Sequence, residues 1–304
     1  MSPELRHILS EDELALVSEK DNIKAALTLL FDWLFIAFLF ALASEMTNPI
    51  TLFIVTLLLG GRQLALEIIV HETGHNTFFS SKKVNHLAGT WLSGYWVFSD
   101  KESYMKNHHK HHAACGTADD PDLKNYKSYP ISNASFFRKV TRDLTGEIGL
   151  RRLKSITLSF LNLKNLSKRK KQVLIRSLLC NFLLLLILGA IGSTWLYLLW
   201  ILAFMTSHMC ISRIRQVGEH AAVPSNMSDD PRLNTRTIYV NIFEKILVVP
   251  HDLNYHLEHH LFPAAPIYRL KTLHNLLLSK GYYEGIKFTK GYINLYRQVV
   301  INEN

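Results

Sequence analysis

Long apolar segments lie in two separate parts of the chain. Residues 25–43 carry one charged side chain, and residues 49–59 carry none and continue into apolar sequence as far as Val70. A second apolar region covers residues 177–211, where the glycine-containing residues 189–193 divide it in two. A helix needs about 20 mostly apolar residues to cross a bilayer. We therefore predict an all-α integral membrane protein with four spans in two hairpins, at residues 25–43, 49–69, 173–190 and 194–211.

Basic residues avoid the two short links that join the predicted spans. Residues 44–48 and 189–194 contain no Lys or Arg. Nearly all of the 34 basic side chains lie in the N-terminus, in the long segment after Gly61 and in the tail after Ile211. The positive-inside rule therefore places both termini and the middle segment in the cytoplasm. The net charge of +9 would then lie on one membrane face and attract anionic lipid headgroups, whereas no nucleic-acid-binding motif is present.

The segments around the spans contain a few polar and aromatic features that need explanation. Asp32 lies inside the first predicted span, so it is either a functional acid or a residue that faces another helix. The sequence at residues 10–13 predicts a capped surface helix, and the aromatic residues 84–98 predict either a helix in the headgroup region or a partial re-entry into the membrane. The three cysteines are far apart and are expected to be structural. We expect residues 1–304 to form a single domain.

Three histidine clusters lie outside the apolar segments. The motif H-x-x-H-H occurs twice, and a pair of histidines four residues apart precedes both copies. Positions i, i+3 and i+4 share one face of a helix, so each cluster would point its imidazoles in one direction. The members are His71, His75, His108, His111, His112, His256, His259 and His260. We predict that a cytoplasmic helical cap carries these clusters, and that His86, His109 and His208 lie outside them.

The number of clustered histidines exceeds what one metal ion needs. A structural zinc takes about four ligands, so eight imidazoles imply two metals. Oxidative chemistry next to a lipid-filled helix bundle favours iron, because zinc has no redox chemistry. Glu67, one helical turn before His71, is a candidate to hold that imidazole in place. The residues alone therefore indicate a membrane-embedded, histidine-rich, dinuclear oxidase.

Two other functions compete with this interpretation. Residues 71–75 also fit H-E-x-x-H, the helix of zinc proteases in which the Glu is the general base. An intramembrane protease would leave both H-x-x-H-H clusters without a role. A histidine-rich metal transporter is the non-enzymatic alternative, but the predicted spans lack the polar residues that an ion path needs.

The order of the clusters resembles the membrane fatty acid desaturase superfamily, which has three histidine boxes and two non-haem irons. H-x-x-x-H is followed by H-x-x-H-H and by a distant second H-x-x-H-H, among two apolar hairpins. The resemblance runs from about His71 to Gly281, and residues 120–122 and 254–263 support it. The superfamily also contains hydroxylases and carotenoid ketolases, so the resemblance implies the fold more specifically than the reaction.

The resemblance implies a ninth ligand and several supporting residues. His220 matches the further histidine that completes the di-iron shell, and Gln216 holds the place of an amide that acts through water. Asp122 and Asn254 belong to the motifs that accompany the second and third boxes and are candidates to support the ligands. The implied chemistry is O2 activation and removal of hydrogen from an unactivated carbon, which yields a double bond or an alcohol. The spacing of the first box resembles members that act on acyl chains in lipids.

The resemblance also implies a source of electrons. No His-Pro-Gly-Gly haem motif occurs in the sequence, so we expect no fused cytochrome b5 domain. Electrons would come from a separate ferredoxin or cytochrome b5-type protein. A basic cytoplasmic face would steer such an acidic partner.

Overall fold

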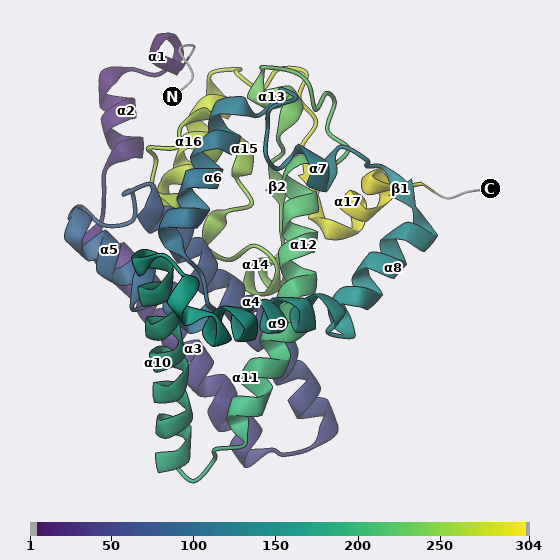
Figure 1. The fold of residues 1–304 in the computed structure, drawn as a ribbon. Coiled ribbons are helices and arrows are strands. Elements are labelled where there is room, and N and C mark those ends of the chain that lie inside the picture. The colour runs from purple at the N-terminus through teal and green to yellow at the C-terminus, as the bar shows by residue number, and fades with distance from the viewer. Residues whose placement is uncertain (1–4, 302–304) are drawn as a thin grey trace.

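The computed structural model describes residues 5–301, which are mostly helical (Figure 1). The α-helices are α1 (Leu5–Ile8), α2 (Glu11–Ser18), α3 (Asn22–Glu45), α4 (Pro49–Gly74), α5 (Lys82–Thr90), α6 (Lys101–Ala114), α7 (Leu123–Tyr126), α8 (Asn133–Leu144), α9 (Glu147–Leu161), α10 (Lys168–Ala190), α11 (Leu196–Met205), α12 (Ser207–His220), α13 (Pro231–Asn234), α14 (Ile242–Leu247), α15 (His256–Leu261), α16 (Leu270–Ser279) and α17 (Gly291–Val299). The short 3-10 helices are η1 (Gly94–Val97), η2 (Leu163–Asn165), η3 (Pro250–Asp252) and η4 (Ile267–Arg269).

Very little sheet accompanies these helices. Strand β1 (Ile131–Ser132) pairs in parallel with β4 (Val300–Ile301), and β2 (Ile238–Tyr239) pairs in parallel with β3 (Thr289–Lys290). Each pairing joins a middle segment to the C-terminal part of the chain. The predicted all-α class therefore holds apart from these two-residue strands.

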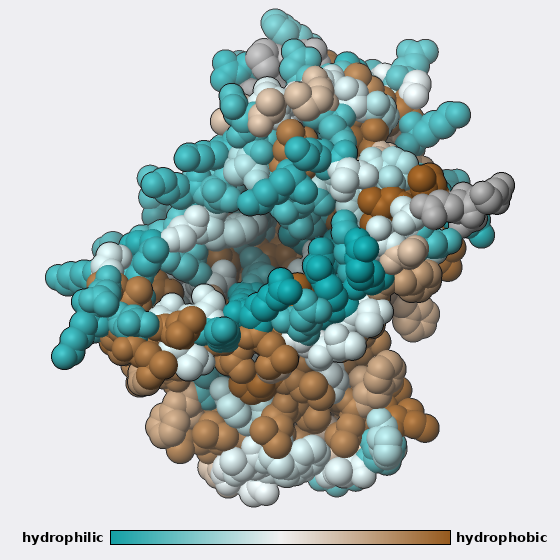
Figure 2. Space-filling view, turned by 45° about the vertical axis from the view of Figure 1, so that its right-hand side comes forward, coloured by the Kyte–Doolittle hydropathy of each residue, from teal (hydrophilic) through white to brown (hydrophobic). Residues whose placement is uncertain are grey.

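Four candidate membrane spans are long and apolar enough to cross a bilayer, as the sequence predicted. They cover Glu11–Glu45, Pro49–Gly74, Lys168–Ala190 and Leu196–His220. In Figure 1 α3, α10 and α11 occupy the lower part of the molecule, and Figure 2 shows that apolar residues gather there while polar residues cover the upper part. Large apolar side chains on these helices remain exposed, as a surface in contact with lipid requires; they include Leu27, Leu34, Phe38, Phe53, Leu179, Phe182, Leu186, Leu198 and Leu202.

The fourth predicted span differs from the continuous helix expected over residues 194–211. The helix begins at Leu196 and is interrupted at Thr206, whose φ and ψ are −121° and −85°. The next residue, Ser207, donates a hydrogen bond from its hydroxyl to the Thr56 carbonyl of α4 at 2.7 Å. A Cβ on Gly60 of α4 would lie only 2.2 Å from the Ser207 hydroxyl oxygen, so glycine is required for this close approach.

Asp32 faces other parts of the protein rather than lipid. Its carboxylate is fully buried and pairs with Arg62 of α4 at 2.9 Å. The second carboxylate oxygen accepts a hydrogen bond from Nε2 of His251 at 2.8 Å, and Arg62 also donates to the Ile246 carbonyl. This buried charged group therefore ties α3 and α4 to the segment that leads into the third histidine cluster.

Several shorter elements begin and end where the sequence indicates. Helix α2 begins after Ser10, which forms a reciprocal capping box with Glu13. Helix α15 ends at Leu261, shortly before Pro263. The aromatic segment 84–98 is not one helix, since α5 ends at Thr90 and a separate 3-10 turn, η1, follows.

Candidate metal centre

The ends of four helices bring the histidines together. His71 lies in the last turn of α4 and His75 is its C-cap residue, while α6, α12 and α15 supply the others. Two groups form. The first contains His71, His75, His108, His112 and His259, and the second contains His111, His220, His256 and His260. All nine histidines predicted from the sequence thus lie in one of two groups whose ring nitrogens are within 4.8 Å of one another.

Helical spacing explains how the histidines of one H-x-x-H-H motif can contribute to both spatial groups. Residues four positions apart lie almost above one another, whereas the residue three positions along is rotated to the other side of that line. His108 and His112 therefore enter the first group, and His111 enters the second. In the same way His256 and His260 lie together, and His259 joins the first group. Each H-x-x-H-H helix contributes to both groups and holds them next to each other.

Three of the imidazoles are fixed by a hydrogen bond from Nδ1. His71 donates to Glu72 Oε1 at 2.8 Å, His111 donates to Asp120 Oδ1 at 2.9 Å, and His220 donates to the Asn234 carbonyl at 3.1 Å. A neutral imidazole carries one proton, so these bonds place it on Nδ1 and leave Nε2 with a free lone pair. Such outer hydrogen bonds are the usual means of orienting a metal-binding histidine.

The Nε2 atoms converge at distances that fit metal ligands. His111 Nε2 and His220 Nε2 are 3.2 Å apart, and neither carries a proton to share. His220 Nε2 and His256 Nε2 are 3.0 Å apart, and His71 Nε2 and His108 Nε2 are 2.8 Å apart. Ligands that lie about 2.1 Å from a metal are separated by about 3.0 to 3.4 Å in octahedral or tetrahedral geometry. The donor set therefore fits two metal ions bound by imidazole nitrogen.

Burial keeps His75 and His112 neutral, and the neutral imidazole is the form that binds metal. Burial, followed by the approach of His109, lowers the pKa of His75 to about 4. Burial and the neighbouring imidazoles lower the pKa of His112 to about 2. The His75 Nε2 atom is buried without a hydrogen-bond partner among the described residues, although it lies within the first group. An orphaned nitrogen of this kind is explained by a cation that the group is built to hold.

Carboxylates near the ligands balance positive charge. Besides Glu72 and Asp120, Glu219 places Oε1 3.5 Å from His256 Nδ1 and 2.6 Å from Arg215. Imidazole ligands bring no negative charge to bound metal ions. The nearby acids therefore lower the electrostatic cost of burying the positive charge of those ions. Glu219 was not among the predicted residues, and Glu72 was predicted only as the general base of the alternative protease, although each acid is a direct neighbour of a predicted ligand in the sequence.

Two acidic residues chosen from the sequence do not hold a ligand imidazole. Glu67 pairs with Arg152 at 3.2 Å and lies 3.5 Å from His208 Nε2, so it supports the helix bundle instead of His71. The carboxylate of Asp122 lies 4.0 Å from His111 Nδ1, farther than that of Asp120. The turn at this point directs Asp120 inward, because its Oδ1 also accepts a hydrogen bond from the Asp122 backbone N–H at 2.8 Å.

The two amides chosen from the sequence also differ in their placement. Asn254 donates from its side chain to the Ile238 carbonyl at 2.9 Å, so it connects strand β2 to the segment before α15. Gln216 lies one turn before His220 on α12 and lines a cavity of about 200 Å³ together with His220. Gln216 therefore lies beside the second group, whereas the Asn254 amide binds the backbone of β2.

The histidines expected to lie outside the centre do so. His86 and His109 are exposed, although the His109 ring lies 5.5 Å from that of His75. His208 is buried, stacks on Phe204 and approaches Glu67. These contacts give it a structural role.

Glu72 is not available as the general base of a protease. Its Oε1 accepts the His71 proton at 2.8 Å, and its Oε2 accepts from the Ile267 backbone N–H at 3.0 Å and from the Thr77 hydroxyl at 3.3 Å. Both oxygens thus bind neighbouring groups in the buried interior. This arrangement favours a carboxylate that orients a ligand over one that activates water.

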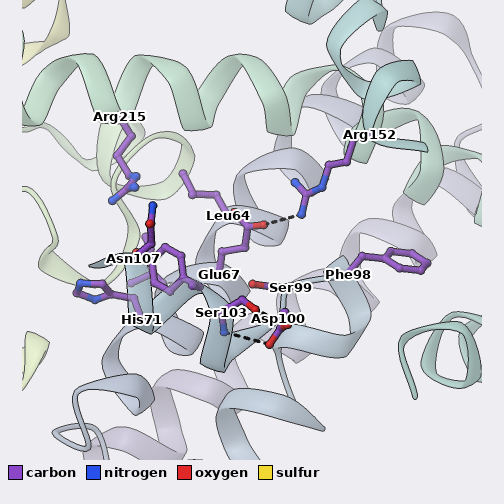
Figure 3. A pocket seen from close by; sticks show the side chains of 12 residues that line it. Leu64, Glu67, His71, Phe98, Ser99, Asp100, Ser103, Asn107, Arg152 and Arg215 are labelled. Carbon is purple, nitrogen blue, oxygen red and sulfur yellow. Dashed lines mark hydrogen bonds and ion pairs between the residues drawn. The ribbon is translucent and has the colours of Figure 1, made fainter. Parts of the chain in front are cut away.

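A cavity of about 450 Å³ adjoins the first group, and His71 forms part of its wall (Figure 3). A second cavity of about 200 Å³ reaches His108, His111, His220 and His256. Both cavities share His71, Tyr104, Asn107 and Arg215 as lining residues. The metal centre is therefore accessible from a preformed space.

Comparison with known proteins agrees with this geometry. The family model of the fatty acid desaturases matches residues 47–292, which include all nine histidines. The dihydrorhizobitoxine desaturase of Bradyrhizobium elkanii is similar to this chain, with 26% identity over 228 residues. That alignment covers 70% of this chain and 64% of the relative, so the chain spans less than two thirds of the length of the relative that it matches.

Proposed function

Because the chain belongs to the membrane fatty acid desaturase superfamily, we propose that it is an oxygen-dependent di-iron lipid desaturase. In this proposal it introduces a double bond into an acyl chain carried on a membrane lipid. The observation that supports this most directly is the convergence of nine imidazoles in adjacent groups of five and four. An all-nitrogen ligand set of this size suits redox iron better than hydrolytic zinc.

The proposed ligands of the two irons are the nine histidines of both groups. They are His71, His75, His108, His112 and His259 on one side and His111, His220, His256 and His260 on the other. When bound, two non-haem irons would supply O2 activation and the removal of hydrogen from an unactivated carbon. The chain's own part is to hold nine unprotonated nitrogens in place, three of them through Glu72, Asp120 and the Asn234 carbonyl.

The overall reaction needs electrons from outside the chain. The substrate loses two hydrogen atoms, and O2 is reduced to two water molecules with two further electrons and two protons. We propose a separate ferredoxin or cytochrome b5-type protein as the donor. The net charge of +9 supports an acidic partner, because opposite charge accelerates encounter.

The proposed topology places the metal centre on the cytoplasmic side. The four spans would form two hairpins, with both termini and the polar helices in the cytoplasm. The absence of Lys and Arg from residues 44–48 and 189–194 supports this orientation. The Ser44 and Ser193 hydroxyls are 3.1 Å apart, so both links lie at the same end of the bundle.

Expression in a host with a simple lipid profile tests the proposed function. Mass spectrometry of the extracted lipids should reveal an acyl chain with a new double bond, and the product should disappear in a His111→Ala variant. A new hydroxyl group would instead favour a hydroxylase or ketolase of the same superfamily. An unchanged lipid profile with altered cellular metal content would favour a transporter.

A further inference from the structure

A buried tyrosine is linked to both imidazoles that face each other in the second group. Tyr126 is the last residue of α7, and only 1% of its surface is exposed. Its ring stacks on the imidazole of His220, with 5.1 Å between the ring centroids and 23° between the ring planes. Its hydroxyl donates a hydrogen bond to Oδ2 of Asp120, the carboxylate whose Oδ1 accepts the His111 proton. One side chain therefore contacts His220 directly and reaches His111 through Asp120.

The hydroxyl of Tyr126 holds the second oxygen of the Asp120 carboxylate. Oδ1 of Asp120 accepts hydrogen bonds from His111 Nδ1 at 2.9 Å and from the Asp122 backbone N–H at 2.8 Å. Oδ2 accepts the hydrogen bond from Tyr126. The terminal torsion of an aspartate has a broad energy minimum, so bonds to both oxygens are needed to fix the plane of the carboxylate. Loss of the hydroxyl would let this plane rotate and would loosen the orientation of His111.

The ring of Tyr126 restrains His220 in a different way. Nδ1 of His220 donates to the Asn234 carbonyl at 3.1 Å, which fixes the position of one nitrogen. The terminal torsion of a histidine is also broad, so a single hydrogen bond leaves the ring free to tilt. The aromatic ring stacked on its face limits this tilt, and such pairs contribute stability beyond the area that they bury. The direction of the His220 Nε2 lone pair therefore depends on Tyr126.

The surrounding core holds Tyr126 itself in place. Tyr126 belongs to a buried apolar cluster that also contains Val217 of α12, Ile238 of β2 and Val299 of α17. Its backbone carbonyl accepts a hydrogen bond from the Tyr129 N–H at 3.1 Å. Close-packed interiors of this kind transmit strain and leave a side chain little room to move. The ring and the hydroxyl are therefore offered to His220 and Asp120 from one fixed position.

We propose that Tyr126 is a positioning residue of the metal centre, which sets the relative orientation of two proposed ligands, His111 and His220. The proposal rests on the proposed two-metal centre. It gives separate parts to the hydroxyl, which acts on His111 through Asp120, and to the ring, which acts on His220. Both ligands belong to the second group, so the effect of Tyr126 is confined to one of the two metal sites.

Titration of the purified full chain with Co²⁺, in competition with a chelator of known affinity, tests this assignment. Co²⁺ takes the same imidazole ligands as Fe²⁺, and the absorption band that is missing from His220→Ala identifies the second site. Tyr126→Phe keeps the ring and removes the hydroxyl. It should weaken the second site about threefold to tenfold, as expected for one hydrogen bond, and leave the first site within about twofold. Tyr126→Leu also removes the stack and should weaken the second site about threefold to tenfold further.

Tyr129→Phe is the matched control for the loss of a buried hydroxyl. Tyr129 lies three residues after Tyr126 and belongs to the same buried cluster, but its hydroxyl binds Lys139 at 3.4 Å. This variant should keep both cobalt affinities within about twofold. The Phe variants decide the proposal even where the Leu variant fails to fold.

A double variant separates positioning from packing. In the Asp120→Ala protein the Tyr126 hydroxyl has no carboxylate to hold. Tyr126→Phe should therefore change the cobalt affinity of that protein by less than about twofold, because the two changes act on one chain of contacts. A hydroxyl that matters only for packing would cause the same loss in both backgrounds.

The results also separate this proposal from the proposed function, because cobalt binding does not depend on turnover. Unchanged affinity of the second site in Tyr126→Phe, equal losses at both sites, or an undiminished loss in the Asp120→Ala background would overturn the positioning role alone. The site-selective loss in a chain that forms no desaturated lipid would support the role of Tyr126 and overturn the proposed reaction. A chain that binds no Co²⁺ would overturn both the two-metal centre and the role of Tyr126.

Discussion

His111 and His220 face each other through Nε2 atoms that are 3.2 Å apart and that both lack a proton. Each ring gives its single proton to an acceptor on the other side, Asp120 for one and the Asn234 carbonyl for the other. Two lone pairs at this distance repel each other unless a cation lies between them. This relationship explains why a histidine outside the repeated motifs belongs with them, and the first prediction follows from it.

We expect His220→Ala to remove one iron and to abolish turnover. The second group would keep three imidazoles of its four, and the iron content should fall from about two to about one per chain because a lost ligand weakens that site. Metal analysis of purified protein measures this. His109→Ala is the control, since His109 is exposed and lies outside both groups. Full iron content in the His220 variant would remove it from the proposed shell.

Asp120 and Asp122 should differ sharply when each is replaced by Asn. Asp120→Asn weakens the hydrogen bond that orients His111, and outer partners of this kind change metal affinity by about 10- to 100-fold. Asp122→Asn should change affinity by less than about threefold, because its carboxylate lies 4.0 Å from the same nitrogen. Competition with a chelator of known affinity measures both values. The opposite ranking of the two variants would contradict the orientation of this turn.

The sequence predicts the long helices and the clustering of the nine histidines because both depend on local spacing. Apolar runs give the four long helices, and the i, i+3, i+4 pattern places His108, His111 and His112 on one side of α6. Helical spacing separates His111 from His108 and His112, but it does not specify which other imidazoles each of them meets. Those partners depend on where α4, α12 and α15 end around α6, which no single motif specifies.

The supporting residues whose observed partners differ from the expected ones depend on distant segments or on turn geometry. Glu67 has the helical spacing to reach His71, but its carboxylate instead binds Arg152, which is 85 residues away in the sequence. Asp120 and Asp122 flank the same proline, and only the folded turn decides which one meets His111. The break at Thr206 reflects the close contact of the next residue with α4. None of these contacts leaves a periodic signal in the sequence.

The buried pair Asp32–Arg62 should contribute strongly to stability. Asp32→Ala leaves the Arg62 guanidinium buried without its partner, and the free energy of unfolding should fall by about 3 to 5 kcal/mol. Denaturant titration in detergent measures the loss. As a control, Glu147→Ala breaks the exposed pair with Arg151 and should cost less than about 1 kcal/mol. A similar loss in both variants would show that the buried pair contributes no more to the free energy of unfolding than the exposed pair does.

Cysteine labelling should place the two short links on the face opposite the metal centre. In a background without native cysteines, Thr47→Cys and Ile191→Cys are suitable because both positions are exposed, whereas Ser193 is buried. An impermeant reagent should label them only from the outside of intact cells, because residues 44–48 and 189–194 carry no basic side chain. Lys110→Cys on α6 should react only after the cells are opened. Labelling of either link from the cytoplasm would contradict the four-span topology.

Product analysis with purified protein, a reduced electron donor, a defined acyl substrate and ¹⁸O₂ tests the central claim most directly. The account predicts a product that has lost two hydrogen atoms, contains a new double bond and carries no ¹⁸O, because both oxygen atoms leave as water. Omission of oxygen or the His220→Ala substitution should abolish that product. A product with one ¹⁸O atom and no double bond would contradict desaturation and identify a hydroxylase, and peptide cleavage with bound zinc would contradict the di-iron assignment as well.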